Sequence, residues 1–248
     1  MQVAILTIGD ELLAGQTTNT NASWLGSQIT DRGGSVRRIL TIPDDRELIA
    51  ETVSRWSETF DAVVVTGGLG GTPDDVTIEA VAAGLERDLV VFPDVREQIL
   101  EKGRELRAER PEFFEEYDLE FDVDAAASLP DGARSIVTDA GWSPGCVIEN
   151  VYVFAGIPDE MKAMFDVVET EFSGDIVSQT VFTPAPEGSL RAVLEGVGEQ
   201  FDVSVGSYPQ SEDRLGRLRI TGTDEATVED ATAWIRERVE TGQPPDSK

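Results

Sequence analysis

Short apolar runs alternate with helically spaced apolar residues along the first two thirds of the chain. The runs predict strands at residues 3–8, 36–42, 62–66, 136–137 and 151–155. Between them, apolar residues recur every three or four positions, as on the buried face of a helix, and a charged helical stretch is expected at 94–117. Strands that alternate with helices form right-handed crossovers. The pattern therefore predicts an α/β fold with three layers, α/β/α, around a mostly parallel sheet.

The order of elements changes beyond a break at residues 173–175. From there the pattern predicts a strand, a helix, two strands and a helix, at residues 179–183, 187–200, 203–208, 217–222 and 225–240. This order suits a small open α+β sandwich. The sequence thus predicts two domains, residues 1–174 and residues 175–248, the second of them with a polar, frayed tail.

Acidic residues dominate the composition. Asp and Glu total 48 against 20 Lys and Arg, which gives a formal net charge of −28. This balance argues against a nucleic-acid partner, because clustered cations are needed to neutralise phosphates, and against docking on an anionic membrane. The basic residues comprise 17 Arg and 3 Lys, a pattern associated with cytoplasmic proteins of extreme halophiles. An ordinary acidic cytosolic protein is the alternative.

Several kinds of site are excluded by residues that the chain lacks. It contains no His and one cysteine, Cys146, which excludes a Ser-His-Asp triad, a His-ligated metal and a multi-Cys zinc site. Acid–base or metal chemistry must then use carboxylates, hydroxyls, backbone groups, Arg or Tyr. No apolar run approaches the ~18 residues of a membrane span, and the first residues show no signal-peptide pattern. We therefore expect a cytoplasmic protein without a membrane partner.

A glycine-rich segment follows the strand predicted at 62–66. It contains Gly67, Gly68, Gly70, Gly71 and Thr72. Open α/β sheets bind ligands at the carboxyl ends of their strands, and glycines allow a phosphate to approach backbone N–H groups. The segment is therefore a candidate phosphate-binding loop. A long permissive turn is the alternative, because the segment is neither a Walker A loop nor a GxGxxG fingerprint.

Two carboxylates and a threonine come directly after this loop, at Asp74, Asp75 and Thr77. Carboxylates beside a bound pyrophosphate would repel it unless a divalent cation bridged them. Mg²⁺ is characteristically held by one or two carboxylates together with phosphate oxygens. The pair thus indicates a metal-dependent phosphate site, and the alternative is that the aspartates only stabilise the start of the next helix.

Polar side chains follow the other predicted strands as well. Glu11 comes after the first strand, Asn21 near the start of the next helix, and Asp44 after the second strand. Since parallel strands end at one edge of a sheet, these side chains are expected beside the loop, as metal or ligand contacts. Each has a capping role as its alternative, for Asp44 in a capping box with Glu47. Turns further along are expected to complete the pocket at Ser143, Gly145 and Pro158.

Taken in order, these motifs resemble the CinA family (competence/damage-inducible protein A) and its version of the molybdopterin-binding, MoaB/Mog-like domain. The segments that carry the resemblance are residues 9–15, 20–22, 67–77, 143–145 and 156–161. The resemblance covers residues 1–172 and implies the same three-layer fold for them. The part after residue 175 is similar to the small subdomain that follows in CinA proteins. We expect the chain to lack the C-terminal nicotinamide mononucleotide deamidase domain of full-length members.

The resemblance implies a small-molecule site for a nucleotide or a pterin phosphate. CinA-type members imply hydrolysis of dinucleotide pyrophosphates such as ADP-ribose or FAD, dependent on Mg²⁺ or Co²⁺. Mog-like members imply adenylyl transfer to molybdopterin. By motif, Asp75 and Asp44 take the catalytic positions, and Asp75 with Asp44 or Glu11 is expected to hold the metal. Related domains assemble as dimers or trimers, so a homo-oligomer is expected.

Three positions depart from the family pattern. Gly71 stands where the family usually has Pro, and Pro73 where it often has His or Ser. Residues 125–127 are three alanines where a Lys-Gln or Arg-Gln pair is usual. If that cation assists the pyrophosphate chemistry, the protein binds its ligand without turnover. A non-catalytic binding protein is therefore a third alternative, beside the hydrolase and the molybdopterin protein.

Overall fold

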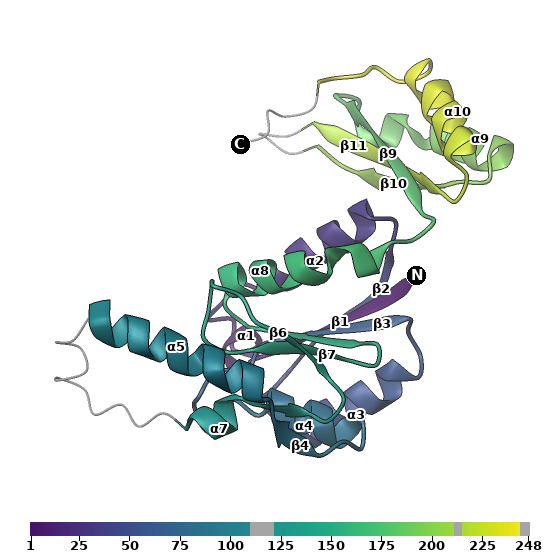
Figure 1. The fold of residues 1–248 in the computed structure, drawn as a ribbon. Coiled ribbons are helices and arrows are strands. Elements are labelled where there is room, and N and C mark those ends of the chain that lie inside the picture. The colour runs from purple at the N-terminus through teal and green to yellow at the C-terminus, as the bar shows by residue number, and fades with distance from the viewer. Residues whose placement is uncertain (110–121, 211–214, 244–248) are drawn as a thin grey trace. The chain divides into compact units, whose positions relative to one another are not determined.

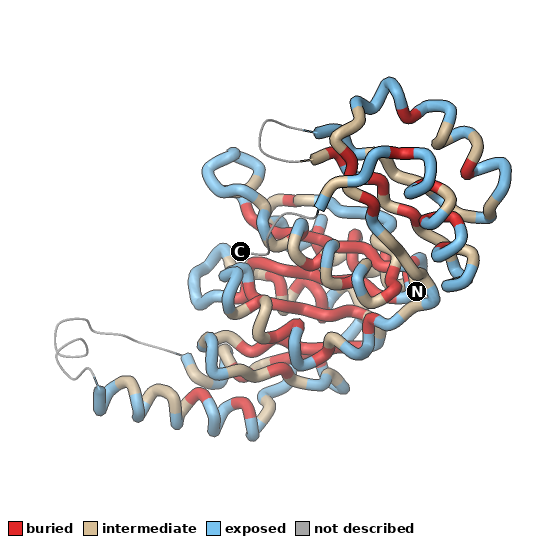
Figure 2. The backbone as a smooth tube through the Cα atoms, turned by 90° about the horizontal axis from the view of Figure 1, so that it is seen from above, coloured by how far each residue is buried: buried red, intermediate tan, exposed pale blue. Residues whose placement is uncertain are grey.

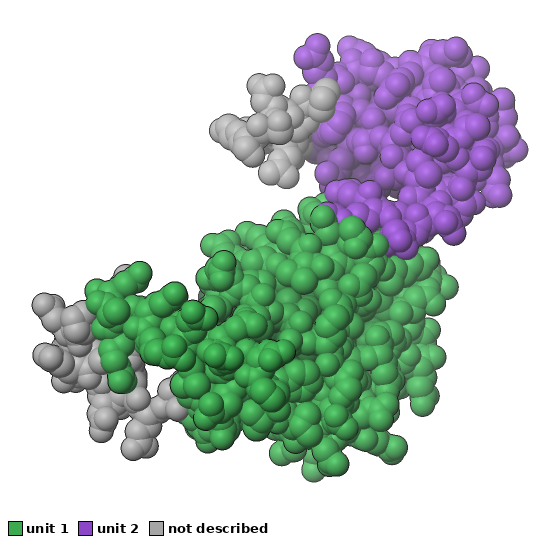
Figure 3. Space-filling model, in the orientation of Figure 1, with its two compact units in different colours: residues 1–29, 35–172 green, residues 30–34, 173–248 purple. Residues whose placement is uncertain are grey.

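The computed structural model describes residues 1–109, 122–210 and 215–243. The chain forms two compact units, one of residues 1–29 and 35–172 and the other of residues 30–34 and 173–248 (Figure 3). Each unit has its own sheet and its own apolar core. Among the described helices, none is long and apolar enough to cross a membrane.

A six-stranded sheet forms the centre of the first unit, in the order β2-β1-β3-β8-β7-β6. Its strands are β1 (Gln2–Ile8), β2 (Ser35–Ile42), β3 (Ala62–Thr66), β6 (Arg134–Ile136), β7 (Gly145–Ile148) and β8 (Val151–Phe154). β2, β1, β3 and β8 run parallel, whereas β7 and β6 join antiparallel. The mostly parallel sheet is confirmed, and an antiparallel extension at one edge is added to it.

Helices cover both faces of this sheet (Figure 1). α2 (Thr20–Asp31) and α8 (Pro158–Val168) lie on one face, and α3 (Arg46–Ser57) and α4 (Thr77–Gly84) lie on the other. The shorter elements are α1 (Asp10–Leu13), β4 (Leu89–Val91), α7 (Val123–Ala126), β5 (Ser128–Pro130) and the 3₁₀ turn η1 (Glu169–Phe172). The three-layer arrangement predicted from the alternation of strands and helices is confirmed.

The central strands are buried on both of their faces. Residues 3–6 of β1 and 62–65 of β3 have no exposed surface, and Figure 2 shows the middle of the sheet as buried backbone. Strands covered by helices on both sides are continuous apolar runs rather than alternating ones. This coverage is why their positions can be read from the sequence.

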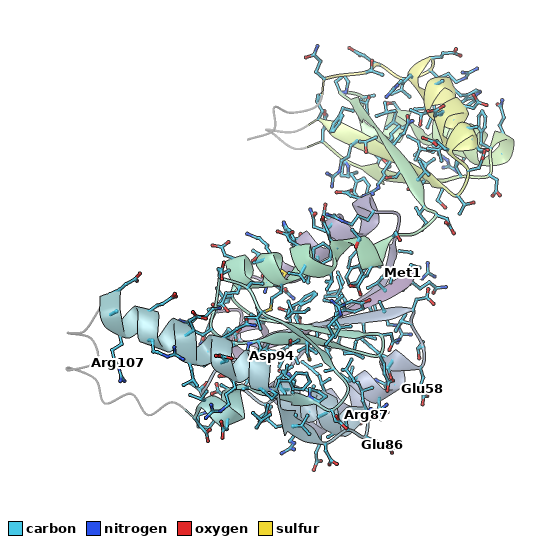
Figure 4. All side chains as sticks on the ribbon, viewed as in Figure 1. Met1, Glu58, Glu86, Arg87, Asp94 and Arg107 are labelled. Atoms are coloured by element: carbon cyan, nitrogen blue, oxygen red, sulfur yellow. The ribbon has the colours of Figure 1, made fainter. Side chains whose placement is uncertain are left out.

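α5 (Pro93–Glu109) begins within one residue of the charged stretch predicted at 94–117. Figure 4 shows Asp94 near one end of this helix and Arg107 near the other, and each charge complements the helix dipole at its own end. Val95 and Ile99 are its buried residues, so the helix packs through a short apolar face. The end of the predicted stretch lies outside the described residues.

A three-stranded antiparallel sheet forms the second unit, in the order β10-β11-β9. Its elements are β9 (Val177–Thr183), the 3₁₀ turn η2 (Glu187–Ser189), α9 (Arg191–Gln200), β10 (Ser204–Tyr208), β11 (Gly216–Gly222) and α10 (Glu225–Arg236). α9 and α10 pack on one face of the sheet (Figure 1), where Val181, Leu218 and Ile220 meet Val228 and Ile235 in one core. The predicted small α+β subdomain is confirmed, with its strand, helix, strand, strand, helix order.

The boundary of the second unit differs from the division expected between residues 174 and 175. The first unit ends at Phe172, and residues 30–34 group with the second unit. The N–H of Gly174 donates to the carbonyl of Arg32 at 3.1 Å, and the N–H of Ile176 donates to the carbonyl of Gly33 at 3.2 Å. A short segment from early in the chain is thus paired with the start of the second unit, which no local sequence pattern indicates.

Candidate functional site

A cleft of about 360 Å³ opens at the carboxyl edge of the six-stranded sheet. Its lining comes from the loops after four strands: residues 9, 11, 12 and 17–21 after β1, Asp44 after β2, residues 67, 68, 74 and 75 after β3, and residues 156–158 after β8. Segments far apart in the sequence meet here because parallel strands end at the same edge.

Gly67 and Gly68 form the turn that leads out of β3. Their φ angles are 109° and 64°, in the region that favours glycine, and a Cβ atom on Gly67 would overlap the carbonyl oxygen of Ile8. The hydroxyl of Thr77 donates to the carbonyl of Gly67 at 2.8 Å, and its N–H donates to that of Gly68 at 3.2 Å. Thr77 is fully buried, so it supports the turn from beneath and does not line the cleft.

Asp75 closes the outer part of the loop on itself. Its Oδ2 accepts hydrogen bonds from the Thr72 N–H at 2.9 Å and from the Thr72 hydroxyl at 2.5 Å. A Cβ atom on Gly70 would overlap the same carboxylate. These contacts fold the loop away from the cleft, so Gly70, Gly71 and Thr72 lie outside its lining while Asp74 and Asp75 belong to it.

Asp44 lies among three other acidic side chains. Its Oδ2 accepts a hydrogen bond from the N–H of Asp10 at 3.0 Å, which favours the charged form. Burial nevertheless raises the pKa of Asp44 above its ordinary value, and repulsion from Asp10, Glu11 and Asp74 adds to the rise. The mouth of the cleft therefore concentrates negative charge around Asp44.

Two capping roles considered from the sequence belong to neighbouring residues. The side chain of Asp45, not that of Asp44, caps α3 by accepting from the N–H three residues further on, at 2.9 Å. At the start of α2, the side chain of Asn19 accepts from the N–H of Ala22 at 3.1 Å. Asp44 and Asn21 are thereby left to face the cleft.

Asn21 joins the start of α2 to the ends of β3 and β8. Its Nδ2 donates to the carbonyl of Gly156 at 2.7 Å and to the hydroxyl oxygen of Thr66 at 3.4 Å. The Thr66 hydroxyl gives its own proton to the carbonyl of Ala155 at 2.6 Å, so its oxygen can only accept from Asn21. Both partners are acceptors, which fixes the orientation of the amide, and Asn21 Oδ1 is left without a partner among the described residues.

The remaining predicted site residues divide between the cleft and its surroundings. Glu11, in α1, and Pro158, at the start of α8, line the cleft. Gly145 is buried in β7, where a Cβ atom would overlap the carbonyl oxygen of Val153, so strand packing requires this glycine. Ser143, two residues before it, is also outside the lining.

Some residues of the cleft were not predicted. Thr7 and Thr66 stand at the ends of β1 and β3, and residues 17–20 form a wall of hydroxyl and amide groups. Asp10 contributes its backbone N–H to Asp44. The signal that marks the wall is the Thr-Thr-Asn-Thr-Asn run at 17–21, which follows the first strand and so must lie at the ligand-binding edge.

The electrostatics of the cleft suit a cation. Its described lining includes Glu11, Asp44, Asp74 and Asp75 and contains no lysine or arginine. Oxygen donors are the ligands that Mg²⁺ prefers. Within residues 1–109, 122–210 and 215–243, no group of three His, Cys, Asp or Glu side chains converges as a metal site. The described side chains alone therefore form no complete metal site, and a cation held by these carboxylates would need further oxygen ligands, such as those of a phosphate.

A second cavity, of about 510 Å³, lies between α3 and α4. Glu51, Glu58, Glu86 and Glu149 are among its lining residues, and Figure 4 labels Glu58 and Glu86 on this part of the first unit. The cavity collects the C-terminal ends of two helices that follow parallel strands, so it lies at the sheet edge opposite the cleft. None of the predicted site residues lines it.

The fold defines the first unit as an α/β domain with a cleft between a glycine turn and a group of carboxylates, at the carboxyl edge of its sheet. Residues 4–173 match the family model described as a probable molybdopterin binding domain, and the chain belongs to that family. Residues 175–246 match the model described as the middle domain of FAD synthase. The two matches divide the chain close to the boundary between its units.

Relatives extend the match over nearly the whole chain. A protein of Archaeoglobus fulgidus is 33% identical over 96% of this chain and 97% of its own length. A CinA-like protein of Citrifermentans bemidjiense is 32% identical, and the match covers 96% of this chain and 58% of that protein. A crystal structure of CinA from Thermoplasma acidophilum, of unknown function, matches with a TM-score of 0.59 and 31% identity over 69% of this chain and 97% of that one. The resemblance to the CinA family is confirmed.

Proposed function

We propose that the cleft binds a nucleoside-diphosphate-linked compound such as ADP-ribose or FAD and hydrolyses its pyrophosphate with Mg²⁺ or Co²⁺. The position of Asp44 carries the proposal. A Cβ atom added to Gly68 would lie 3.3 Å from Asp44 Oδ1, so the most crowded carboxylate of the cleft stands beside the glycine turn. A pyrophosphate on that turn meets no cationic side chain in the described lining, and a bound cation would offset the charge.

The glycine turn and its supports form the phosphate-binding half of the proposed site. The turn at Gly67 and Gly68 lets a phosphate approach backbone N–H groups without a side chain in the way. The two hydrogen bonds from Thr77 hold that turn in its positive-φ conformation before the ligand arrives. Asn21, with its amide fixed by Gly156, forms the facing wall.

The carboxylates form the other half of the proposed site. Asp44 and Asp75, with Glu11, would hold the cation together with oxygens of the substrate. When bound, a divalent cation polarises the phosphorus and lowers the pKa of the attacking water. Asp75 keeps one oxygen on Thr72, which orients the carboxylate and leaves its other oxygen for the cation.

The family match supports a second candidate function. Residues 4–173 belong to a family described as a probable molybdopterin binding domain. A pterin phosphate presents the same anionic group to the glycine turn as a nucleotide does. Molybdopterin binding, or adenylyl transfer to it, is therefore the alternative that uses the same cleft.

A third candidate function is ligand binding without turnover. Ala125 and Ala126 line a cavity of about 80 Å³ together with Gly70 and Asp75. The CinA resemblance leads one to expect a Lys-Gln or Arg-Gln pair in this segment, next to the loop. The alanines leave that position without a cation, which supports a binding protein that has lost its chemistry.

Incubation of the purified protein with ADP-ribose, FAD or ATP, after removal of metal and again with Mg²⁺ or Co²⁺, tests the proposal. We expect AMP to be released from ADP-ribose or FAD only when metal is present. Asp44→Asn and Asp75→Asn should each lower kcat by at least about a hundredfold. Asp94→Asn serves as the matched control, because Asp94 is an exposed aspartate of α5 outside the cleft.

The outcomes separate the three functions. AMP release that persists in both cleft variants would place the chemistry elsewhere and contradict the proposal. Molybdopterin binding without release of AMP from either dinucleotide would favour the second function. Binding of a dinucleotide without turnover, measured by calorimetry, would favour the third.

A further inference from the structure

The sheet of the second unit has one face that its helices leave open. α9 and α10 pack against the face that carries Val181, Leu218 and Ile220. Side chains alternate between the two faces of a strand, so the neighbouring positions point away from this core. Those outward positions are Ser178, Thr180, Phe182, Ser204, Gly206, Tyr208, Arg217, Arg219 and Thr221. We call this set the open face.

Aromatic rings and an arginine form one row across the open face. Arg217 lies in register with Phe182 on one side and with Tyr208 on the other. The Arg217 guanidinium carbon is 4.7 Å from the centroid of the Tyr208 ring. A Cβ atom on Gly206 would lie 3.2 Å from that ring, so the glycine makes room for Tyr208 to lie along the sheet. The row therefore presents flat π surfaces next to a positive charge.

A second cation stands in the next row. Arg219 is in register with Thr180 and Gly206, and its Nη2 donates to the Ser178 hydroxyl at 3.0 Å. It also lies 3.8 Å from a carboxylate oxygen of Asp31, so its charge is partly compensated. Arg217 is 4.7 Å from an aromatic ring and pairs with no carboxylate in the described part of the chain.

The outward strand positions of the open face lack the acidic residues that dominate the composition of the chain. The whole chain has a formal net charge of −28, yet none of the nine outward positions is Asp or Glu. Although the Asp31 carboxylate lies beside Arg219, five acidic residues of the unit are carried by α9 and α10, on the other side of the sheet. A helix is about 10 Å wide and the Debye length is about 8 Å in physiological salt, so most of that negative charge is screened from the open face.

We propose that the open face binds a short stretch of single-stranded nucleic acid. Bases stack on exposed aromatic rings whatever their sequence, and arginines pair with the phosphates between them. The row of Phe182, Arg217 and Tyr208 supplies both contacts at strand spacing, and the serine and threonine hydroxyls around Arg219 supply hydrogen bonds to sugar and phosphate. An acidic peptide would use the arginines but would leave the rings without a planar partner. The proposal departs from the expectation, based on net charge, that no nucleic acid binds.

The test is fluorescence anisotropy of a labelled oligo(U) and oligo(dT) of about ten nucleotides with the full chain. We expect saturable binding that the double variant Arg217→Gln/Arg219→Gln weakens at least about tenfold, and Tyr208→Ala by a similar factor. With two phosphates contacted, the logarithm of the binding constant should fall against that of the salt concentration with a slope of about −1.4. ADP-ribose added in excess should not displace the oligonucleotide.

Arg191→Gln/Arg236→Gln is the matched control. It removes the same charge from α9 and α10, on the other side of the sheet. Because salt screens charges at that distance, it should change the affinity for the oligonucleotide less than about twofold. Thermal melts of all variants confirm that they fold. Absence of saturable binding, equal weakening by both double variants, or displacement by ADP-ribose would each overturn the proposal. Light scattering would detect self-association. If it depends on Arg217 and Arg219 and no oligonucleotide binds, the proposal is overturned, and a second copy of the acidic chain is the partner of the open face.

Discussion

The two units of this protein arrange charge in opposite ways. Four carboxylates and no cation are found in the described lining of the cleft in the first unit. Arg217, Arg219 and no carboxylate are found at the outward positions of the sheet in the second unit. The net charge of −28 belongs to the whole chain and does not distinguish the two surfaces. It describes the long-range field, but local contacts decide each site because salt screens charges beyond about 8 Å.

The two units also have separate apolar cores. Phe165, Phe154 and Phe172 belong to the core of the first unit, in which Phe165 stacks on Phe172 with centroids 5.2 Å apart. Ile220 and Val181 belong to the core of the second unit. No residue is shared between the two clusters. The comparison therefore predicts that a core mutation in one unit destabilises that unit and leaves the stability of the other unchanged.

The largest expected effect concerns the single thiol of the first unit, Cys146. Burial raises the pKa of Cys146 from 9.0 to about 12, so near pH 8 its thiolate fraction is about a thousandfold below that of an exposed thiol. Alkylation then requires the first unit to open. Labelling with iodoacetamide, followed by mass spectrometry, should be at least about a thousandfold slower for the folded protein than for the protein in urea, because burial removes both the thiolate and the access of the reagent.

Two core variants use this thiol to test the independence of the units. Phe165→Ala should cost about 3–5 kcal/mol and accelerate the labelling of Cys146. Ile220→Ala should cost about 2–5 kcal/mol in the second unit and leave the labelling rate unchanged. Equal acceleration by both variants would mean that the units unfold together, and the contrast between two separate cores would fail.

The same pKa shift gives the first unit a defined dependence on alkaline pH. The folded protein favours the protonated thiol, so this stabilisation is complete below the unfolded pKa of 9.0 and is lost as the pH rises toward about 12. A shift of this size corresponds to about 4 kcal/mol. Urea midpoints should fall over that range and fall less in Cys146→Ala.

Strands could be predicted from the sequence where burial marks them. The run at 62–66 coincides with β3 because a strand covered on both faces is continuously apolar. β7 was not predicted. It is a four-residue strand, and it reaches β8 through a tight turn in which Glu149 has a φ of 54°. Such turns are usually marked by Asn-Gly or Asp-Gly, so a glutamate in this conformation gives no signal.

The candidate site could be predicted in its elements but not in its atoms. The edge of the sheet and the glycine loop follow from the strand pattern. The choice between Asp44 and Asp45, or between Asn19 and Asn21, does not, because neighbours of the same chemistry are separated only by backbone geometry. Nor does any pattern show that Asp75 bonds to Thr72 and so turns part of the loop away.

The next expected effect tests whether the cleft is built on a turn that requires glycine. Gly67→Ala places a Cβ atom on a residue with a φ of 109°, against the carbonyl of Ile8, and should cost about 2–4 kcal/mol in urea unfolding. Gly71→Ala is the control, since nothing lies within 4 Å of an added Cβ there, and should change stability by less than about 0.5 kcal/mol. Equal costs would show that the glycines serve only as a flexible loop.

The smallest expected effect tests the charge contrast itself. The pKa of Asp44 is raised by burial and by Asp10, Glu11 and Asp74, so the folded protein disfavours the ionised form. Asp44→Asn should therefore stabilise the ligand-free protein near pH 7, by no more than about 0.5 kcal/mol because the carboxyl is largely solvated. The gain should vanish as the pH falls below 3.8, where the carboxyl is protonated in the folded and the unfolded protein alike.

Arg217→Gln supplies the counterpart in the second unit. Arg217 contacts the Tyr208 ring and pairs with no carboxylate among the described residues, so its replacement should lower the free energy of unfolding near pH 7 by no more than about 1 kcal/mol. A loss of stability in Asp44→Asn would mean that the hydrogen bond from Asp10 outweighs burial and repulsion, so that the ionised Asp44 does not destabilise the fold. A gain would mean that Asp44 is retained against the stability of the fold. A carboxylate retained in this way is expected where a bound cation, absent from the unliganded protein, requires it.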